Sequence, residues 1–418
     1  MNPEIKRRIE QIRRGNVPEE YKKAIVGIIP DSWEPKKLKD ICEINPPRKK
    51  KEPAQTTFLG MSDVDDSGHI IAQHKMDIHQ IKSGLTPFER GDILVAKITP
   101  CFENGKGANT KTLQTETGFG STEFHVLRNK KDGDFIFYHT ISHSFRQKLE
   151  REMTGSAGQK RVQVDSLGNY VIPFPGRSER RSIVDILSAQ DSIIVLKEKR
   201  LTEKQRQKKY LMQQLLTGKK RLSDFTVPWV ATSLGNLFSE RKETNCEKLQ
   251  LLAITGTQGV IPRSKLDLKD NSSEDKSKYL KIRIGDIGYN TMRMWQGVSA
   301  YSDYEGIVSP AHTILKPVAD IDAKYFSYLF KLPETVFLFY RFSQGLVDDT
   351  RNLKYENFKK ITVRYPSDRR EQTAIAKVLS TADREIDLLR QDIDQEKQKK
   401  KALMQLLLTG IVRVTPCH

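Results

Sequence analysis

The sequence has very little cysteine and no long apolar run. Its four cysteines, Cys42, Cys101, Cys246 and Cys417, lie at least 59 residues apart, which fits neither a disulfide framework nor a zinc-ligand pattern. No run of 18 apolar residues is available to span a membrane. The N-terminal sequence MNPEIKRRIEQIRRG lacks the apolar core of a signal peptide. We therefore expect a cytoplasmic protein with reduced thiols and no membrane contact.

Motifs that would mark a DNA-modifying active site are also missing. The triplet Asn45-Pro46-Pro47 begins like the Asn-Pro-Pro-aromatic motif of DNA amino-methyltransferases, in which the aromatic ring stacks on a flipped base. Here Arg48 occupies the aromatic position, and no glycine-rich loop for S-adenosylmethionine follows. The sequence favours a turn at this triplet.

Nuclease and metal-site patterns are equally weak. Asp31 and Glu34, with Lys36, are only three residues apart in a proline-rich turn, whereas a nuclease places its carboxylates on neighbouring strands. His139 and His143 are four residues apart on an expected helix, without the glutamate of a zincin or a third ligand. We expect no catalytic residue, metal or cofactor in this chain.

Positive charge is abundant. The 418 residues include 71 Lys and Arg against 53 Asp and Glu, a formal net charge of +18. This excess favours a polyanionic partner, and nucleic acid is the usual one; a merely basic soluble protein is the alternative. The length predicts two to three domains.

The chain repeats itself over about half its length. The sequence LMQQLLTG at 211–218 returns as LMQLLLTG at 403–410, with seven of eight residues identical and an offset of 192. The same offset aligns Glu179 with Glu371 and Asp191 with Asp383, and GDI at 91–93 returns at 285–287. Each copy is therefore a divergent globular part followed by a nearly identical helix.

Apolar residues at three- and four-residue spacing predict the two long helices, at about 178–217 and 370–409. A single apolar stripe on so long a helix needs a partner, and the duplicate helix would supply it as an intramolecular coiled coil. The stripes weaken at 203–209 and 395–401, where a solvated polar face or a basic patch is expected. The leucines expected to bind the partner helix are Leu187, Leu201, Leu211, Leu215, Leu379, Leu389, Leu403 and Leu407.

The globular parts predict an α+β fold. Short β-favouring runs at 92–98, 124–128, 170–174, 312–316 and 361–365 lie between turn residues. The segments 134–153 and 322–342 read as helical. The expected order is a basic helix at 1–21, a domain at 22–177, a helix at 178–221, a domain at 222–367, a helix at 368–412 and a tail at 413–418.

These features resemble the specificity subunit of type I restriction–modification systems. The repeated YLMQQLLTGKKRL and ALMQLLLTGIVRV, each ending a long helix, are similar to that family's two shared regions. GDILVAKITPCFENGKGA (91–108) with GFGSTEFHVLR (118–128), and YNTMRMWQG (289–297) with GIVSPAH (306–312), resemble its target recognition domains. The resemblance covers nearly the whole chain.

The resemblance implies a non-catalytic DNA-reading protein. Two tandem target recognition domains would each read half of a split, asymmetric double-stranded DNA site. The long helices would form an antiparallel coiled coil that makes the chain pseudo-two-fold symmetric and sets the spacing of the half-sites. Two methyltransferase subunits would dock on these helices, and restriction subunits would join them. Adenine-N6 methylation and ATP-dependent cleavage would then reside in those partners.

Arg, Lys, Asn and Gln are the side chains that read base edges in the major groove. In the first domain they gather in 154–162 and in a cluster at 97–106, and in the second domain in 343–354 and near 293. Alternation along a strand at 291–297 would point Arg293 away from Met292 and Met294. The candidate DNA-binding residues are Lys97, Thr99, Asn104, Lys106, Gly155, Gln159, Lys160, Arg161, Arg293, Trp295, Gln296, Gln344, Arg351, Asn352 and Lys354.

Alternatives remain at each level. Each candidate residue could be an ordinary loop residue, and the basic run at 46–53 could be a solvated loop or a phosphate contact. The whole chain could be a coiled-coil scaffold without specific DNA readout. The scaffold predicts no steep salt dependence of DNA binding, whereas phosphate contacts predict a strong one.

Overall fold

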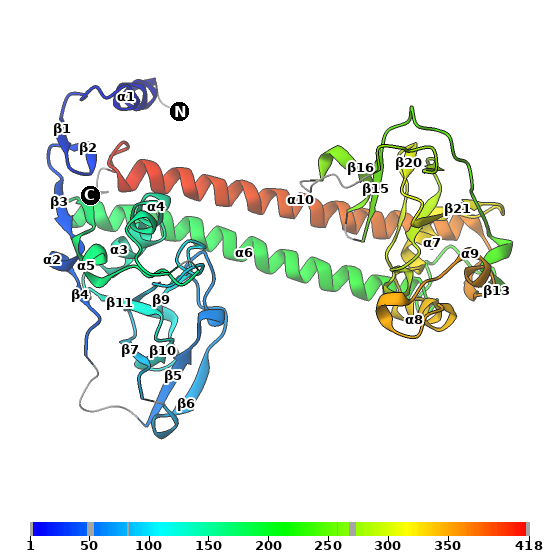
Figure 1. Cartoon of the computed structure of the whole chain (residues 1–418), viewed down its shortest axis with the longest axis horizontal. Helices are drawn as coiled ribbons and strands as arrows, with labels where there is room; N and C mark the ends of the chain where they lie inside the picture. The colour runs from blue at the N-terminus through cyan, green and yellow to red at the C-terminus, as the bar shows by residue number, and fades with distance from the viewer. Residues whose placement is uncertain are drawn as a thin grey trace. The chain divides into compact units, whose positions relative to one another are not determined.

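The computed structural model describes residues 3–47, 54–81, 83–156, 158–256, 258–266 and 273–414. The chain forms two compact units (Figure 1). Unit 1 consists of Met1–Leu196 and Ile393–His418, and unit 2 consists of Lys197–Asp392. The units differ from the expected linear order of domains because each one takes half of each long helix. Most of the predicted basic run, residues 48–53, lies outside the described residues.

Unit 1 is built on two four-stranded sheets. One has the order β6-β5-β10-β7, with bounds His74–Asp77, Gln55–Leu59, Thr117–Gly120 and Thr86–Glu89. The other has the order β4-β11-β8-β9, with bounds Glu43–Ile44, Phe124–Arg128, Ile93–Ala96 and Gly107–Asn109. Strand β1 (Tyr21–Ala24) pairs with β2 (Gly27–Pro30), and β3 (Glu34–Lys37) with β12 (Val171–Phe174). Its short helices are α1 (Pro3–Arg13), α2 (Leu38–Ile41), α3 (Gly133–Thr140), α4 (His143–Arg151) and α5 (Val164–Asn169).

The described residues of unit 2 form one four-stranded sheet and three strand pairs. The sheet has the order β14-β21-β18-β19, with bounds Phe238–Glu240, His312–Pro317, Ile287–Asn290 and Ser299–Tyr301. The pairs are β13 (Trp229–Ser233) with β22 (Thr362–Pro366), β15 (Leu252–Thr255) with β16 (Gly259–Pro262), and β17 (Leu280–Ile282) with β20 (Gly306–Val308). Its short helices are α7 (Ala323–Leu329), α8 (Pro333–Phe342) and α9 (Tyr355–Phe358).

Short 3-10 turns connect these elements in both units: Met61–Asp63, Ile78–Gln80, Thr110–Thr112, Leu234–Asn236, Arg263–Lys265, Met294–Gln296 and Asp348–Thr350. No helix in the described part of the chain is both long and apolar enough to cross a membrane.

The α+β prediction is confirmed, and the five expected β runs overlap β8, β11, β12, β21 and β22. Each expected short helix is divided in two, into α3 and α4 and into α7 and α8. The break in unit 1 has a clear cause, since the Ser142 hydroxyl accepts the N–H of Phe145 and begins a new helix. In unit 2, Pro333 is the first residue of α8, a position where its missing N–H costs nothing.

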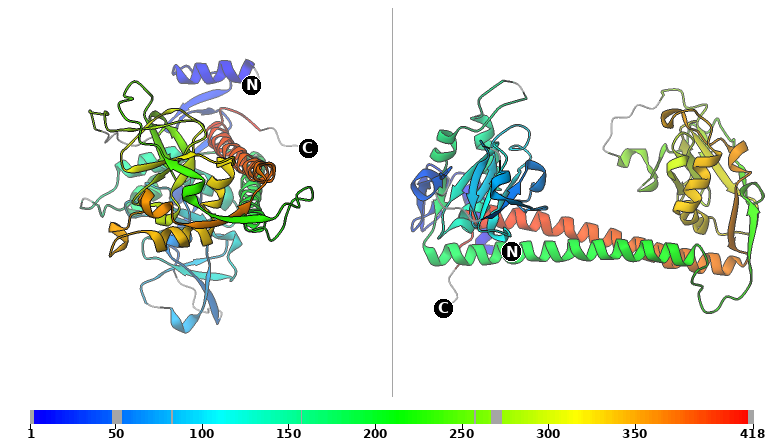
Figure 2. Two further views of the ribbon diagram at one scale, coloured as in Figure 1. Left: turned by 90° about the vertical axis from the view of Figure 1, so that its right-hand side faces the viewer. Right: turned by 90° about the horizontal axis from the view of Figure 1, so that it is seen from below.

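The long helices are α6 (Arg177–Leu215) and α10 (Arg369–Leu408), of 39 and 40 residues. Inside each unit, one half of α6 lies beside one half of α10 (Figures 1 and 2). In unit 1, Gln190 donates to Glu396, and Asp191 pairs with Lys400. In unit 2, Lys197 pairs with Asp392 and Lys204 with Glu385. Lys208 also pairs with Asp383, so in unit 2 the partner numbers on α10 fall as the numbers on α6 rise, and the helices there are antiparallel.

The expected partner leucines divide into two groups. Leu187, Leu215, Leu379 and Leu407 are buried and belong to the hydrophobic cores of the units, whereas Leu201, Leu211, Leu389 and Leu403 are half-buried. Ile186, which the spacing also placed on the stripe, is 37% exposed. Where the stripes weaken, Lys204, Lys208 and Lys400 bind carboxylates of the other helix. This part of the predicted polar face is therefore an inter-helix ion-pair surface.

A carboxylate at the start of each long helix binds residues from other parts of its unit. Glu179 of α6 accepts two hydrogen bonds from Arg413, at 2.7 and 3.0 Å, and a third from the Trp33 indole at 2.9 Å. Glu371 of α10 is fully buried and accepts the same kinds of bond from Arg221 and Trp229. In both units the arginine follows the end of the other long helix, so each helix end is fastened to the start of its neighbour.

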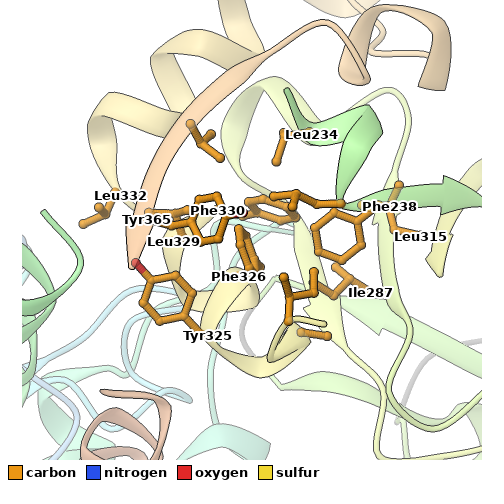
Figure 3. Packing of buried hydrophobic residues seen from close by; sticks show 14 of the residues in the cluster. Leu234, Phe238, Ile287, Leu315, Tyr325, Phe326, Leu329, Phe330, Leu332 and Tyr365 are labelled. Atoms are coloured by element: carbon orange, nitrogen blue, oxygen red, sulfur yellow. The ribbon is translucent and has the colours of Figure 1, made fainter. Parts of the chain in front are cut away.

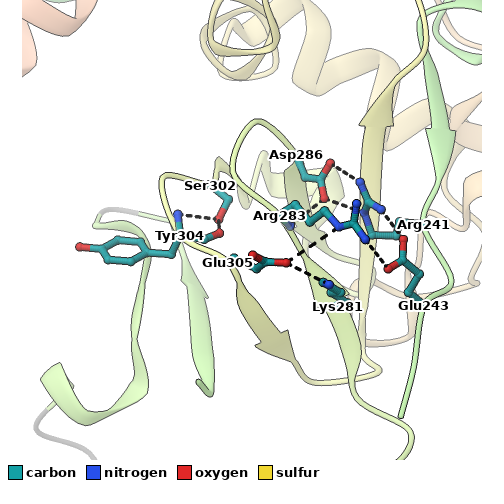
Figure 4. Close-up of polar contacts among 8 residues, drawn as sticks. All are labelled: Arg241, Glu243, Lys281, Arg283, Asp286, Ser302, Tyr304 and Glu305. Carbon is teal, nitrogen blue, oxygen red and sulfur yellow. Dashed lines mark hydrogen bonds and ion pairs between the residues drawn. The ribbon is translucent and has the colours of Figure 1, made fainter. Parts of the chain in front are cut away.

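The repeated GDI triplet begins the central strand of each unit. Asp92 accepts the Glu89 N–H at 2.7 Å and binds Arg128, and Asp286 accepts the Arg283 N–H at 2.8 Å and binds Arg241. Figure 4 shows the network around Asp286, which also includes Glu243 and Glu305. The preceding glycines, Gly91 and Gly285, both have φ of 93°, a conformation that glycine adopts without steric cost. In both copies of the repeat, the carboxylate of a buried aspartate therefore accepts a backbone N–H of the same turn.

Aromatic side chains fill the core of unit 2 (Figure 3). Phe330 packs at ring-centroid distances of 5.4 Å from Phe339 and 5.8 Å from Phe358, with near-perpendicular rings. Leu215 of α6 and Leu379 of α10 belong to the same cluster. The helix pair and the globular part of the unit therefore share one core.

We predict that Leu187→Ala and Leu379→Ala each destabilise their own unit by about 2–5 kcal/mol, because both leucines are 0% exposed and truncation leaves a cavity. Leu388→Ala is the matched control, since Leu388 is 58% exposed on α10; it should change stability by less than about 0.5 kcal/mol. Hydrogen exchange at increasing guanidinium concentration resolves the two units. An equal loss from Leu388→Ala would contradict this helix interface.

Candidate nucleic-acid interface

The two candidate clusters of unit 1 meet at one end of the central strand β8. The Val162 N–H donates to the Lys97 carbonyl at 2.9 Å, and the Thr99 N–H donates to the Lys160 carbonyl at 3.0 Å. The segment 97–106 and the loop 154–162 therefore form one surface, although they are about 60 residues apart in sequence. The loop comes from the end of α4, and the segment comes from the end of β8.

The candidate side chains of unit 1 do not have equal freedom to bind a ligand. Asn104, Gly155, Gln159 and Lys160 are exposed. Their neighbours are engaged inside the protein: Thr99 donates its hydroxyl to Glu103 at 2.7 Å, and the Lys106 ammonium donates to the Met61 carbonyl at 2.8 Å.

Arg161 is held by an acidic partner that the sequence analysis missed. Its guanidinium binds both oxygens of Glu123, with Nε–Oε2 at 3.0 Å and Nη2–Oε1 at 2.9 Å. The hydrogen bond from Arg161 holds the pKa of Glu123 below its usual value. Glu123 immediately precedes β11 (Phe124–Arg128), and the pairing of β11 with β8 places it beside the end of β8.

His125 fixes the other end of the loop. Its Nε2 lies 2.8 Å from the Val162 carbonyl, and its Nδ1 lies 3.3 Å from the Asn45 amide nitrogen. These distances assign a neutral ring that donates through Nε2 and accepts at Nδ1. Asn45 has φ of 50° and exchanges hydrogen bonds with the backbone of Val126. The Asn-Pro-Pro triplet thus starts with a turn residue that orients a loop.

Unit 2 brings its two clusters together with the same backbone contact. The Leu353 N–H donates to the Thr291 carbonyl at 2.9 Å, just as Val162 donates to Lys97 in unit 1. Thr291 follows the central strand β18, and the loop 343–354 follows helix α8. The loop is itself closed by paired hydrogen bonds of 2.8 Å between Gln344 and Asn352.

An aromatic side chain links the two clusters of unit 2. The Arg351 guanidinium lies 4.0 Å from the Tyr340 ring centroid and donates to the Tyr340 hydroxyl at 2.9 Å. The Trp295 ring lies 6.3 Å from the same ring, edge to face. Arg351 also pairs with Asp348. The exposed candidates in unit 2 are Arg293, Gln296, Gln344 and Lys354.

The strand geometry considered for 291–297 is wrong. Strand β18 ends at Asn290, and Met294–Gln296 form a 3-10 turn that ends at Gly297 with φ of 79°. Met294 is buried while Met292 is 43% exposed, so the two methionines do not share a face. Arg293 is exposed because it precedes the turn, and not because side chains alternate.

The described residues contain no cluster of three or more metal-ligating side chains. His139 and His143 do not share a helix, since α3 ends at Thr140 and α4 begins at His143. His139 is buried against Phe135, and burial lowers the pKa of His139 to about 3. It is a neutral core residue.

Comparison with known families identifies the class of protein. The family described as "Type I restriction modification DNA specificity domain" matches residues 30–206 and again residues 226–397. The chain therefore belongs to this family and carries its domain twice, as the internal repeat predicts.

Individual relatives agree with this assignment. The chain is 31% identical over 268 residues to the type I restriction enzyme EcoAI specificity subunit of Escherichia coli, a match covering 60% of this chain and 44% of that protein. It is 38% identical over 167 residues to the EcoEI specificity subunit of the same organism, covering 38% and 28%. These matches span less than half the length of each relative.

A solved structure shares the fold. The S subunit of a type I restriction–modification system from M. genitalium superimposes with a TM-score of 0.56 at 13% identity, covering 90% of this chain and 96% of that one. This likeness and the two family matches confirm the predicted fold class of two tandem domains with long helices.

We predict that acid loosens the loop 154–162. Burial lowers the pKa of His125 from its ordinary 6.5, so the unfolded chain takes up a proton near that pH while the folded ring stays neutral. The stability contributed by the neutral ring is therefore lost as pH falls below 6.5. Hydrogen-exchange protection of the Val162 amide should decrease from pH 7.5 to pH 5.

His125→Gln should flatten this pH dependence, and His143→Gln should leave it intact because His143 is exposed on α4. An equally steep decrease in the His125→Gln protein would show that another group controls the loop.

Proposed function

We propose that this chain reads a split, asymmetric duplex DNA site, with one half-site bound by each unit. One observation carries the proposal: in each unit, a segment after the central strand and a loop after a helix are joined by the same backbone hydrogen bond. Both pairs present exposed amide and cationic side chains, which are the groups that read base edges and contact phosphates. The net charge of +18 supports a polyanionic ligand.

The two half-sites differ because the exposed side chains differ. Unit 1 presents Asn104, Gln159 and Lys160, whereas unit 2 presents Arg293 and Gln296 together with aromatic residues. Arginine favours guanine and glutamine favours adenine in bidentate contacts. The remaining candidates, among them Arg161 and Arg351, shape the loops through Glu123 and Tyr340.

The long helices are proposed to dock two methyltransferase subunits, which restriction subunits then join. Exposed apolar residues on the helices support this docking: Ile193 is 38% exposed and Leu196 66% exposed on α6, and Leu388 is 58% exposed on α10. Leu196 and Leu388 stand at the repeat offset of 192, so each unit presents an equivalent leucine. Adenine-N6 methylation and ATP-dependent cleavage are assigned to these partners.

The test of this function is a methylome. The full chain is co-expressed with its cognate methyltransferase subunit in a host without DNA methylation, and modified adenines are mapped by single-molecule sequencing. We expect a split motif with two unlike halves that disappears when this chain is omitted. A soluble, active complex that methylates no such motif would contradict the proposal and favour a scaffold.

We predict that Lys160 contacts phosphate in the complex. Lys160→Ala should weaken binding to all DNA sequences alike and reduce the slope of log affinity against log salt by about 0.9, the value for one released counterion. Lys131→Ala is the matched control: Lys131 is exposed and follows the other end of β11. Equal changes in slope for both variants would show that Lys160 acts only through net charge.

A further inference from the structure

Each unit holds a cation beneath its segment after the central strand. In unit 1 this cation is Arg146 of α4, which is 6% exposed. In unit 2 it is Lys331, which is half-buried between α7 and α8. Neither takes part in an ion pair within the described residues. A cation that is buried or half-buried without an ion pair is uncommon because leaving water costs it solvation, so its occurrence in both units calls for a function.

Carbonyl oxygens of the segment replace the missing carboxylate in unit 1. Arg146 Nη1 donates to the Phe102 carbonyl at 3.1 Å, and Nη2 donates to the carbonyls of Gly105 at 3.1 Å and Lys106 at 3.4 Å. Its Nε donates to the Thr140 carbonyl at the end of α3. One guanidinium therefore ties the turn 102–106 to the helices, and it also lies 4.8 Å from the Phe102 ring centroid.

Lys331 makes the corresponding contacts in unit 2. Its ammonium donates to the carbonyls of Gly297 and Ser299, both at 2.6 Å. Gly297 directly follows Gln296, an exposed candidate of that segment, and Ser299 begins β19, the strand into which the segment leads. Burial lowers the pKa of Arg146 to about 9 and that of Lys331 to about 8.

The two cations are not equivalent positions of the repeat. They lie 185 residues apart, whereas the loops they support are offset by 191 to 194 residues. The two units therefore use different residues, at positions that are not equivalent in the repeat, to donate hydrogen bonds to these carbonyls. Inward-pointing carbonyls in a turn require donors, and charged donors form the stronger hydrogen bonds.

We propose that Arg146 and Lys331 are positioning residues, each of which holds the segment of its unit in the shape that reads bases. This inference rests on the proposed DNA-reading function. The cations act from behind the segment and do not touch DNA. Their uncompensated charge also adds to the attraction of that surface for phosphate.

The test measures how well each half-site is distinguished by the complex of the full chain with its methyltransferase subunits. Affinity is compared for three duplexes: the intact site found by the methylome, and the same site with either half scrambled. Scrambling one half-site should cost the wild-type complex at least about 100-fold in affinity, since several mismatched base pairs each contribute. Arg146→Met should reduce that penalty for one half-site to less than about tenfold and leave the other unchanged.

Lys331→Met should produce the mirror result and affect the opposite half-site. Lys148→Met and Lys324→Met are the matched controls, because each removes one positive charge, from α4 and from α7, at a lysine that lies over a tyrosine ring, Tyr170 or Tyr301; both should keep the two penalties. Arg146→Lys retains a cation with fewer donors and should show an intermediate penalty. If thermal unfolding shows that Arg146→Met unfolds unit 1, the half-site penalty of Arg146→Lys tests the positioning role of Arg146 instead.

Retention of both penalties in folded Arg146→Met and Lys331→Met proteins would overturn the positioning role while leaving the DNA-reading function intact. Equal loss at both half-sites from either variant would also overturn it, because the effect would then be global. A wild-type complex that discriminates neither half-site would overturn the proposed function itself.

Discussion

The structure depends on a buried carboxylate at the start of each long helix. Glu179 and Glu371 each bind an arginine that follows the end of the other helix and a tryptophan indole from the globular part. A carboxylate that has left water must be fully hydrogen-bonded, and removal of one partner leaves an uncompensated charge. In each unit, one set of three residues therefore joins the end of one helix, the start of the other and the globular part, at Trp33 before β3 in unit 1 and at Trp229 of β13 in unit 2.

This constraint explains which parts of the internal repeat are nearly identical. Asp191 and Asp383 each bind a lysine of the opposite helix, and each accepts the hydroxyl of a tyrosine, Tyr138 or Tyr328, from its own unit. Any change at such a position disturbs two helices and a domain together. The loops 154–162 and 343–354 differ in sequence, while the backbone contacts Val162–Lys97 and Leu353–Thr291 are kept.

The sequence predicted the structure well where a periodic apolar pattern or an internal repeat records how helices pack. Apolar spacing placed both long helices to within two residues, and the constant offset of 192 predicted their pairing. It was less informative where distant residues meet. Nothing local indicated that Glu123 would capture Arg161, that Tyr340 would stack on Arg351, or that His125 would hold the Val162 carbonyl. The 3-10 turn at Met294–Gln296 escaped because short apolar runs satisfy strand and turn patterns equally.

The composition of the units has a consequence for synthesis on the ribosome. Unit 2 is one continuous stretch, Lys197–Asp392, whereas unit 1 joins Met1–Leu196 to Ile393–His418. Contacts such as that of Tyr21 with Gly410, 389 residues apart, form only when the last segment has emerged. A nascent chain therefore has every residue of unit 2 before it has the last segment of unit 1, and Glu179 lacks its hydrogen bonds from Arg413 until that segment has emerged. Unit 2 is thus complete before unit 1, although synthesis begins with unit 1.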